Sequence, residues 1–325
     1  MRGEEFLTVK LYDTLRDHTP VALFPREIDY TEWQTLRRYP ILNWNMGMTY
    51  RLRERDERVY PQGELARRTI GQVGDKGNYG VEYVLRDVLE GRDGKARRQR
   101  IARGFYGRVV GGDNSEPEDG LDVVTTLDLE MQDVADRALR RQLEAQNALW
   151  GTALVMEVAT GDLLAMANLS RTKSGAYAEV KNHALSSRME PGSTFKLAAL
   201  LALVDDAGMS LDETFDTGNG ARVKVGRTTV QDSHGLPPLN LKDAVAHSSN
   251  VFFARAVYET YKDDPERYVD YLRHLHLDRT VGLEEFGAVA PIFPAPGMKI
   301  WYPDVSIVNM GYGYAIELTP LHTLT

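Results

Sequence analysis

The sequence predicts an α+β fold divided into two domains. Its 325 residues, at roughly 150 residues per domain, favour two domains over one. The first third of the chain is uneven and loop-rich, with glycines recurring between short periodic pieces. After a polar, glycine-rich break, the apolar pattern becomes regular and alternates between strand and helix periods. We therefore expect a small mixed domain followed by a larger domain of strands and helices.

The break lies at residues 111–120, which include no apolar side chain other than one proline and hold three glycines. This composition is typical of a linker or a long exposed loop. We place the first domain at residues 1–112, the linker at 113–120 and the second domain at 121–325. The basic stretch at 95–103 is interpreted as a solvated face, since the chain carries a formal net charge of −8.

Near the start of the second domain, the β-branched stretch 123–126, Val-Val-Thr-Thr, predicts a short strand. Asp128 follows where it can cap a helix, because apolar residues recur at helical spacing from 131 to 143. Two largely apolar segments, 154–158 and 163–167, flank an Ala-Thr-Gly-Asp turn and predict a β-hairpin.

A strongly apolar helix is predicted over 194–207, with Gly208 as its left-handed cap. Shorter helices are expected at 241–247, capped by Asn240, and at 251–258. The helix at 194–207 is expected to be buried because of four of its apolar residues: Leu197, Leu200, Leu201 and Val204.

Composition excludes several classes of protein. Hydrophobic residues make up 42% and charged residues 26%, as in a folded globular chain. The excess of acidic residues argues against a nucleic-acid partner. The absence of cysteine excludes disulfides, thiolate metal sites and a cysteine nucleophile. The longest apolar run, 197–204, is far shorter than the ~20 residues of a membrane span.

Residues 191–196, Pro-Gly-Ser-Thr-Phe-Lys, hold the candidate nucleophile. Serine needs a base within hydrogen-bond reach, and on a helix Lys196 lies one turn after Ser193 on the same face. The first turn also offers free backbone N–H groups and the positive end of the helix dipole to a developing anion. Burial of the helix favours the neutral amine of Lys196, which can accept the serine proton.

A second element, Ser248-Ser249-Asn250, lies between the two shorter helices. Residues i and i+2 point the same way in extended or turn geometry, so Ser248 and Asn250 can face one cleft. The alternative is that Ser249 or Asn250 only caps the next helix. For residues 248–250 taken alone, the capping role is preferred. When the Ser193–Lys196 pair is considered with them, the catalytic interpretation is preferred.

Three other patterns are set aside. A second Ser-x-x-Lys, at Ser170 and Lys173, runs into a glycine and lacks a helix start. The consecutive residues 232–234, Asp-Ser-His, cannot hydrogen-bond in relay. His274 and His276 lack a carboxylate-rich frame, so we expect neither a metal nor an organic cofactor.

Together, two motifs resemble the first two active-site motifs of penicillin-binding proteins and serine β-lactamases: Ser193-x-x-Lys196 and Ser248-x-Asn250. Three longer segments are similar to the class B, monofunctional transpeptidases of this family: 124–132, 157–166 and 190–196. In the first domain, residues 58–61 and 77–82 resemble the pedestal or dimerisation module of that class. Residues 311–314 and 318–321 are similar to the cell-division (septal) type.

The resemblance implies a transpeptidase domain of helices packed on an antiparallel sheet, preceded by a pedestal domain. It implies a D,D-transpeptidase that cross-links peptidoglycan stem peptides at division and is a target of β-lactams. Ser193 would attack the penultimate D-alanine carbonyl, with Lys196 as its base. Ser248 would pass the proton to the leaving amine, and Asn250 would hold Lys196 and the substrate amide. The implied partners are other division and cell-wall synthesis proteins, at the outer face of the bacterial cytoplasmic membrane.

The resemblance also implies a third motif, lysine–threonine/serine–glycine on a strand after the second motif. Residues 173–175, Lys-Ser-Gly, have these letters but precede the nucleophile and lie in an expected loop. An amino-terminal membrane anchor is implied as well. We therefore expect a soluble fragment with an incomplete transpeptidase domain, inactive by itself and prone to self-association.

Two alternatives remain open. A β-lactamase or β-lactam sensor has the same fold, but proteins of that kind usually lack a front domain such as residues 1–112. A non-enzymatic envelope scaffold would act through that first domain.

Overall fold

A computed structural model of the chain describes residues 4–12, 20–22, 28, 32, 35, 36, 38, 39, 48–55, 59–74, 77–95, 98–102, 105–108, 115 and 118–325. The chain forms two compact units, residues 1–63 and 64–325. Among the described residues, no helix has both the length and the apolar character needed to cross a bilayer.

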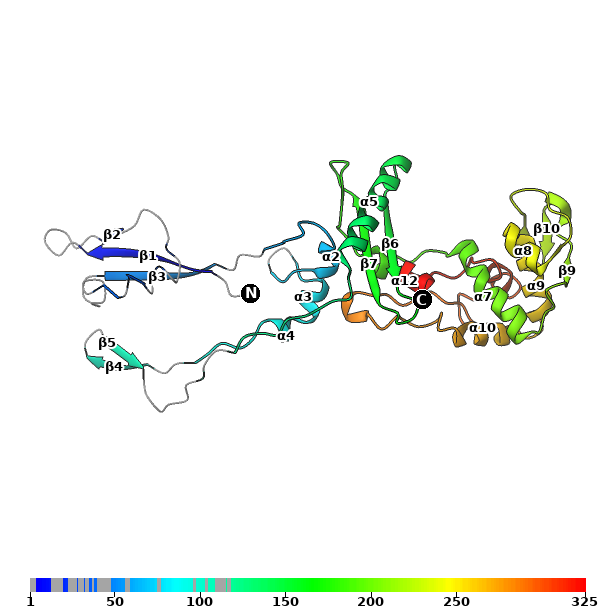
Figure 1. Ribbon diagram of the computed structural model, residues 1–325. Helices are drawn as coiled ribbons and strands as arrows, with labels where there is room; N and C mark the ends of the chain where they lie inside the picture. Colours follow the sequence, from blue (N-terminus) through cyan, green and yellow to red (C-terminus); the bar gives the residue numbers. More distant parts are fainter. Residues whose placement is uncertain are drawn as a thin grey trace. The chain divides into compact units, whose positions relative to one another are not determined.

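The first unit holds a three-stranded antiparallel sheet. Its central strand β1 (Glu4–Tyr12) pairs with β2 (Pro20–Ala22) on one side and with β3 (Met48–Arg55) on the other (Figure 1). The β1–β3 register runs from Glu4 opposite Arg55 to Leu11 opposite Met48.

The second unit holds the remaining described elements. Its strands are β4 (Arg98–Ala102), β5 (Phe105–Arg108), β6 (Trp150–Met156), β7 (Leu163–Arg171), β8 (Tyr177–Ala178), β9 (Thr214–Phe215), β10 (Val223–Val225), β11 (Thr228–Val230) and β12 (Leu239–Asn240). Its α-helices are α2 (Arg67–Ile70), α3 (Gly80–Val84), α4 (Arg86–Leu89), α5 (Leu129–Gln146), α6 (His183–Ser186), α7 (Lys196–Leu201), α8 (Leu241–His247), α9 (Asn250–Tyr261), α10 (Pro265–His274), α11 (Ser306–Met310) and α12 (Pro320–Leu324). Short 3₁₀ and π turns are η1 (Gly192–Phe195), η2 (Ala202–Asp206), η3 (Gly218–Gly220) and η4 (Glu284–Phe286).

The division between the units differs from the expected linker at 113–120. In the described part of that linker, Ser115 and Glu118 form antiparallel bridges with Lys95 and Arg92. The chain before the linker also reaches into the second unit, because the Arg68 backbone N–H donates to the Glu179 carboxylate at 2.7 Å. The limits 1–112, 113–120 and 121–325 therefore do not coincide with the compact units and stay a prediction.

Some of the residues on which these expectations rest lie outside the described residues. They are 58 in the first-domain resemblance, 96, 97, 103 and 104 in and beside the basic stretch, and 113, 114, 116 and 117 in the linker.

The expected hairpin and the helix before it form a helix-on-sheet layer. Strands β6 and β7 pair antiparallel, β8 joins the far edge of β7, and α5 lies against the sheet (Figure 1). The Asp128 carboxylate caps α5 by accepting from the Met131 N–H at 2.8 Å, as predicted. Gly151 lets the layers approach, because a Cβ there would lie 2.9 Å from the Leu143 side chain. The α+β fold with helices on an antiparallel sheet is confirmed.

The strand predicted at 123–126 is wrong. These residues form no ladder with any described strand, and the Val124 side chain is 94% exposed. The segment is instead fixed by single bonds to the start of β7, from the Thr126 hydroxyl and the Asp128 N–H to the carbonyls of Leu163 and Leu164. A strand needs a neighbour to pair with, and the local sequence carries no information about that neighbour.

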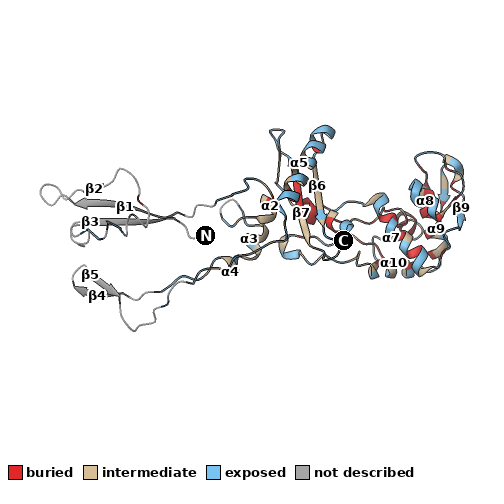
Figure 2. Cartoon of the chain, viewed as in Figure 1, coloured by how far each residue is buried: buried red, intermediate tan, exposed pale blue. Residues whose placement is uncertain are grey.

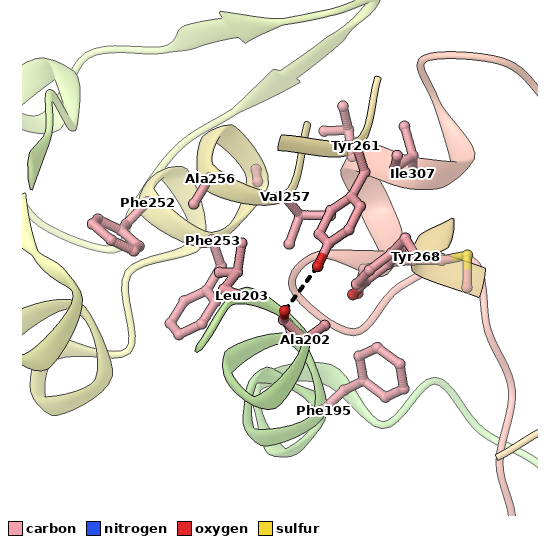
Figure 3. Close-up of a cluster of buried hydrophobic side chains, with 14 of the residues drawn as sticks. Phe195, Ala202, Leu203, Phe252, Phe253, Ala256, Val257, Tyr261, Tyr268 and Ile307 are labelled. Carbon is pink, nitrogen blue, oxygen red and sulfur yellow. Dashed lines mark hydrogen bonds between the residues drawn. The ribbon is translucent and has the colours of Figure 1, made fainter. Parts of the chain in front are cut away.

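Helix α9 is the centre of the main hydrophobic core. Most of its residues are buried, as the red ribbon of Figure 2 shows, and the Phe252 and Phe253 rings meet edge to face at 5.2–5.7 Å with their aromatic neighbours. The Tyr261 hydroxyl donates to the Ala202 carbonyl at 2.8 Å and so ties α9 to η2 (Figure 3). This core fixes the helix that carries the candidate nucleophile against the helix that follows Ser248.

The apolar helix predicted over 194–207 is present as η1, α7 and η2, and Gly208 follows at φ +67°. Its buried side is not the predicted one. Leu197 is 63% exposed and Leu201 40% exposed, while Lys196 lies on the buried side. The apolar residues of this helix do not by themselves show which of its faces α9 covers.

Glu179 ties the segment after residue 64 to the β6–β7–β8 sheet. Its carboxylate accepts from the Arg68 N–H at 2.7 Å and from the Asn168 N–H at 3.3 Å. Burial raises the pKa of Glu179 to about 7, and these two bonds oppose the shift.

We expect Glu179→Gln to remove a pH-dependent loss of stability. Because the folded-state pKa is raised, the contribution of Glu179 is fully present below its ordinary pKa and is lost as the pH rises through about 7. From pH 5 to pH 8, the variant should gain up to about 3 kcal/mol in free energy of unfolding relative to wild type. Urea unfolding across that range measures the difference, with the exposed Glu144→Gln as control. A difference that stays constant with pH would contradict the assignment.

Candidate active site

Ser193 lies in the 3₁₀ turn η1 that leads directly into α7. The turn begins at Gly192, whose φ of +57° favours glycine, and the Gly192 N–H donates to the Gly313 carbonyl at 2.9 Å. The side chain of Ser193 is exposed, whereas Lys196, one turn later, is only 5% exposed. The sequence predicted this placement of the serine at the start of a helix.

Gly313 sets how closely the segment after α11 approaches the nucleophile turn. A Cβ on Gly313 would lie 1.8 Å from the Gly192 carbonyl oxygen, and the backbone of Gly313 has a φ of +88°. The neighbouring Ala315 N–H donates to the Glu190 carboxylate at 3.1 Å. Two backbone segments thus lie in direct contact beside Ser193.

The Ser248–Asn250 segment joins α8 to α9. Ser248 ends α8 with a φ of +52°, an uncommon conformation for a residue with a side chain. Ser249 caps α9 by accepting from the Phe252 N–H at 3.0 Å, so the capping alternative holds for this residue. Asn250 is the first residue of α9, which leaves its side chain free to reach Lys196.

The Lys196 ammonium nitrogen joins the two motifs. Nζ lies 3.1 Å from the Ser193 Oγ, 3.0 Å from the Ser248 Oγ and 2.7 Å from the Asn250 Oδ1. It also donates to the Ser248 carbonyl at 2.6 Å. The structure therefore brings all four predicted residues to one point, although their catalytic roles stay a prediction.

Burial lowers the pKa of Lys196 to about 8, and the charge of Asp232 opposes that shift. An ordinary lysine has a pKa near 10.5, so the shift makes the neutral amine far more common at neutral pH. A neutral amine next to a serine hydroxyl can act as a general base.

Asp232 is the residue that sequence reasoning missed. Its carboxylate accepts from the Ser249 hydroxyl at 2.8 Å and from the N–H groups of Asn250 and Val251 at 2.5 and 3.1 Å. These donors belong to the first turn of α9, whose N–H groups have no partner inside the helix. In the sequence Asp232 stands out only as the first letter of Asp-Ser-His, and no local pattern points to a loop 17 residues further on.

The motifs that the sequence analysis set aside make other contacts. The Ser170 hydroxyl bonds to the ring of His183 at 2.7 Å, and residues 173–175 lie in the turn after β7. Ser233 bonds to His234 at 3.0 Å, and both side chains are exposed. Within the described part of the chain, no group of three His, Asp or Glu side chains has the geometry of a metal site.

The family model of the penicillin binding protein transpeptidase domain matches residues 151–325. Curated relatives include the probable peptidoglycan D,D-transpeptidase PenA of Neisseria meningitidis, 27% identical over 82% of this chain and 45% of its own length. Penicillin-binding protein PbpB of Mycobacterium tuberculosis is 31% identical over 82% of this chain and 40% of its own length. The chain thus spans less than half the length of these relatives.

Solved structures agree in fold. A peptidoglycan synthetase from Bifidobacterium adolescentis has a TM-score of 0.73 at 21% identity, covering 94% of this chain and 55% of its own. Penicillin binding protein 3 of Mycobacterium tuberculosis, complexed with aztreonam, has a TM-score of 0.65 at 25% identity, covering 85% of this chain and 57% of its own.

We expect Gly313→Ala to destabilise the second unit by about 2–4 kcal/mol, because the new methyl group must displace the Gly192 backbone. Gly297→Ala is the matched control, since Gly297 has a similar φ of +83° and no atom within 4 Å of the place its new methyl group would take. Urea unfolding compares the two variants. Equal losses of stability would show that the contact with Gly192 is unimportant.

We expect Asp232→Asn to lower the pKa of Lys196 further, because the aspartate charge raises it in the native protein. Nuclear magnetic resonance of ¹³C-labelled lysine, recorded across pH 6–10, measures this pKa directly. Asp243→Asn, an exposed substitution in the first turn of α8, is the control. An unchanged or raised Lys196 pKa in Asp232→Asn would contradict the expectation.

Proposed function

This chain belongs to the family of penicillin-binding protein transpeptidase domains, and we propose that the protein is a peptidoglycan D,D-transpeptidase working through a serine acyl-enzyme. The observation that carries the proposal is the contact of one buried amine, Lys196 Nζ, with the hydroxyls of both Ser193 and Ser248. Such an arrangement can take a proton from one hydroxyl and return it through the other.

The hydrogen bonds of Lys196 suggest how it acts as a base. The Ser248 carbonyl and the Asn250 Oδ1 can only accept, and at 2.6 and 2.7 Å they are its nearest partners. In the neutral amine these two acceptors take both N–H bonds, so the lone pair faces the two hydroxyls. The lone pair can then receive the proton of Ser193, whose Oγ lies 3.1 Å away.

In the acylation step one bond forms, one bond breaks and a proton is relayed from the serine to the leaving group. The Ser193 Oγ bonds to the carbonyl carbon of the penultimate D-alanine while its proton passes to Lys196. Lys196 passes a proton to the Ser248 Oγ, and Ser248 gives its own proton to the leaving nitrogen. The bond between the carbonyl carbon and that nitrogen breaks, which releases the terminal D-alanine and leaves an ester on Ser193.

In the second half-reaction, an amine of a neighbouring stem peptide attacks the ester carbon. The amine loses a proton along the same path in reverse, a new amide bond forms, and Ser193 regains its hydroxyl proton. Asn250 holds Lys196 in place throughout, and its amide N–H₂ group is the proposed contact for the substrate backbone. These steps need no organic cofactor, because the serine forms the covalent bond.

The relatives' names support the choice of substrate and setting. Escherichia coli FtsI, 26% identical over 83% of this chain, is named a peptidoglycan D,D-transpeptidase, as is PenA. We propose peptidoglycan stem peptides as substrates, β-lactams as inhibitors and a role in cell division. The proposed location is the outer face of the cytoplasmic membrane, with other division and cell-wall synthesis proteins as partners. The names give no support to a β-lactamase, a sensor or a scaffold.

We expect the rate of Ser193 acylation by a penicillin to rise with pH and to level off above about 8. The reason is that only the neutral amine accepts the proton, and a pKa of about 8 leaves roughly a tenth of Lys196 neutral at pH 7. Intact-mass spectrometry of the whole gene product at pH 6–9 measures the rate.

Two variants sharpen this test. Lys196→Arg keeps a permanent charge and should lower the rate by ~10²–10⁴, while Ser193→Ala should abolish labelling. Lys173→Arg, in the second Ser-x-x-Lys, should leave the rate unchanged. Rapid labelling of Ser193→Ala, or a loss of labelling in Lys173→Arg, would contradict the proposed site.

A further inference from the structure

A cavity of about 270 Å³ lies in the second unit and shares no residue with the candidate active site. Four parts of the chain line the cavity. The first is the segment from α2 to α3, and the second is the start of β7 together with residues 125–127 before α5. The third is α6 with the two residues before it, and the fourth is η4 with its flanking residues. Its wall is largely apolar and includes Leu127, Leu163, Met166, Leu185 and Phe286. An apolar cavity of this size suits a small ligand with a compact apolar body.

The charged side chains among the described residues that line the cavity are both cationic, Arg68 and Lys181. Neither forms an ion pair with any residue that the structure describes, although the chain as a whole has a net charge of −8. The Arg68 guanidinium stacks over the Tyr79 ring, 3.6 Å from its centroid. In an acidic protein, two cations with no carboxylate partner in the described chain, beside one apolar cavity, favour an anion.

The wall that carries Arg68 is held in place before any ligand binds. The Gln72–Tyr79 bridge closes its turn, and Gly71 and Gly80 approach so closely that a Cβ on either would lie within 2.7 Å of the other's backbone. The Glu179 carboxylate fixes the Arg68 backbone from the sheet side. Glu179 does not line the cavity, and its bond to Arg68 is to the backbone N–H and not to the guanidinium.

We propose that this cavity binds a small anionic amphiphile, a carboxylate or similar acid group attached to an apolar body. The apolar body contacts Leu127, Leu163 and Phe286, and the acid group lies against Arg68 and Lys181. Burial of the body favours binding, and the two cations select the charged head over a neutral one. Because the cavity shares no residue with Ser193 or Lys196, the inference does not depend on the proposed function.

The test is isothermal titration calorimetry of the whole protein with octanoate, below its micelle concentration, and with octan-1-ol. We expect octanoate to bind with a dissociation constant of about 0.1–1 mM, and the alcohol to bind at least ~5-fold more weakly because it lacks the charge. Equal affinities for the two probes, or no binding of octanoate, would overturn the proposal.

Variants place the binding in the cavity. Arg68→Gln and Lys181→Gln should each weaken octanoate binding ~5-fold, and Val81→Phe should fill the cavity and abolish it. Lys173→Gln, an exposed lysine outside the cavity, is the control and should bind as wild type does. Unfolding midpoints close to wild type establish that each variant is folded. Unchanged octanoate binding in Val81→Phe or in Lys181→Gln would place the ligand elsewhere and refute the proposal.

Discussion

The site depends on one requirement, that a lysine nitrogen buried away from water must have hydrogen-bond acceptors around it. Lys196 is 5% exposed, and its acceptors come from its own helix turn and from the α8–α9 junction. That junction must therefore turn the Ser248 carbonyl and hydroxyl toward the amine, which it does with a left-handed residue at Ser248. The next residues begin α9, whose first N–H groups have no partner inside the helix, and Asp232 accepts from two of them. The same junction thus supplies the acceptors of Lys196 and binds the carboxylate of Asp232.

Asp232 has two different effects on Lys196. As a hydrogen-bond acceptor it holds the junction in the shape that Lys196 requires. As a negative charge it favours the ammonium form and so opposes the effect of burial on the pKa of Lys196. The balance leaves the pKa at about 8, where both protonation states are populated close to neutral pH. A base that must take a proton and then release it benefits from such a balance.

The parts of the fold that follow from short-range pattern could be read from the sequence. Asp128 caps α5 and Asn240 caps α8, since capping involves residues three apart, and Ser193 lies near Lys196 for the same reason. Features that depend on distant neighbours could not be read. The exposure of Leu197 follows from where α9 packs, and Asp232 gains its role from a loop that the sequence alone does not bring close. The resemblance to a family supplied the pairing of the two motifs, which spacing by itself left open.

The bond between Lys196 and the Ser248 carbonyl spans 52 residues of chain, and this span has a consequence for how the molecule folds. Closing so long a loop carries an entropic cost that must be met before the contact contributes, and contacts of high sequence separation generally form slowly. The local pair of Ser193 and Lys196 can exist as soon as α7 forms, whereas the complete site waits for α8 and α9 to dock. The serine therefore becomes reactive only late in folding, when the tertiary structure is complete. Helix formation, measured by circular dichroism, comes earlier.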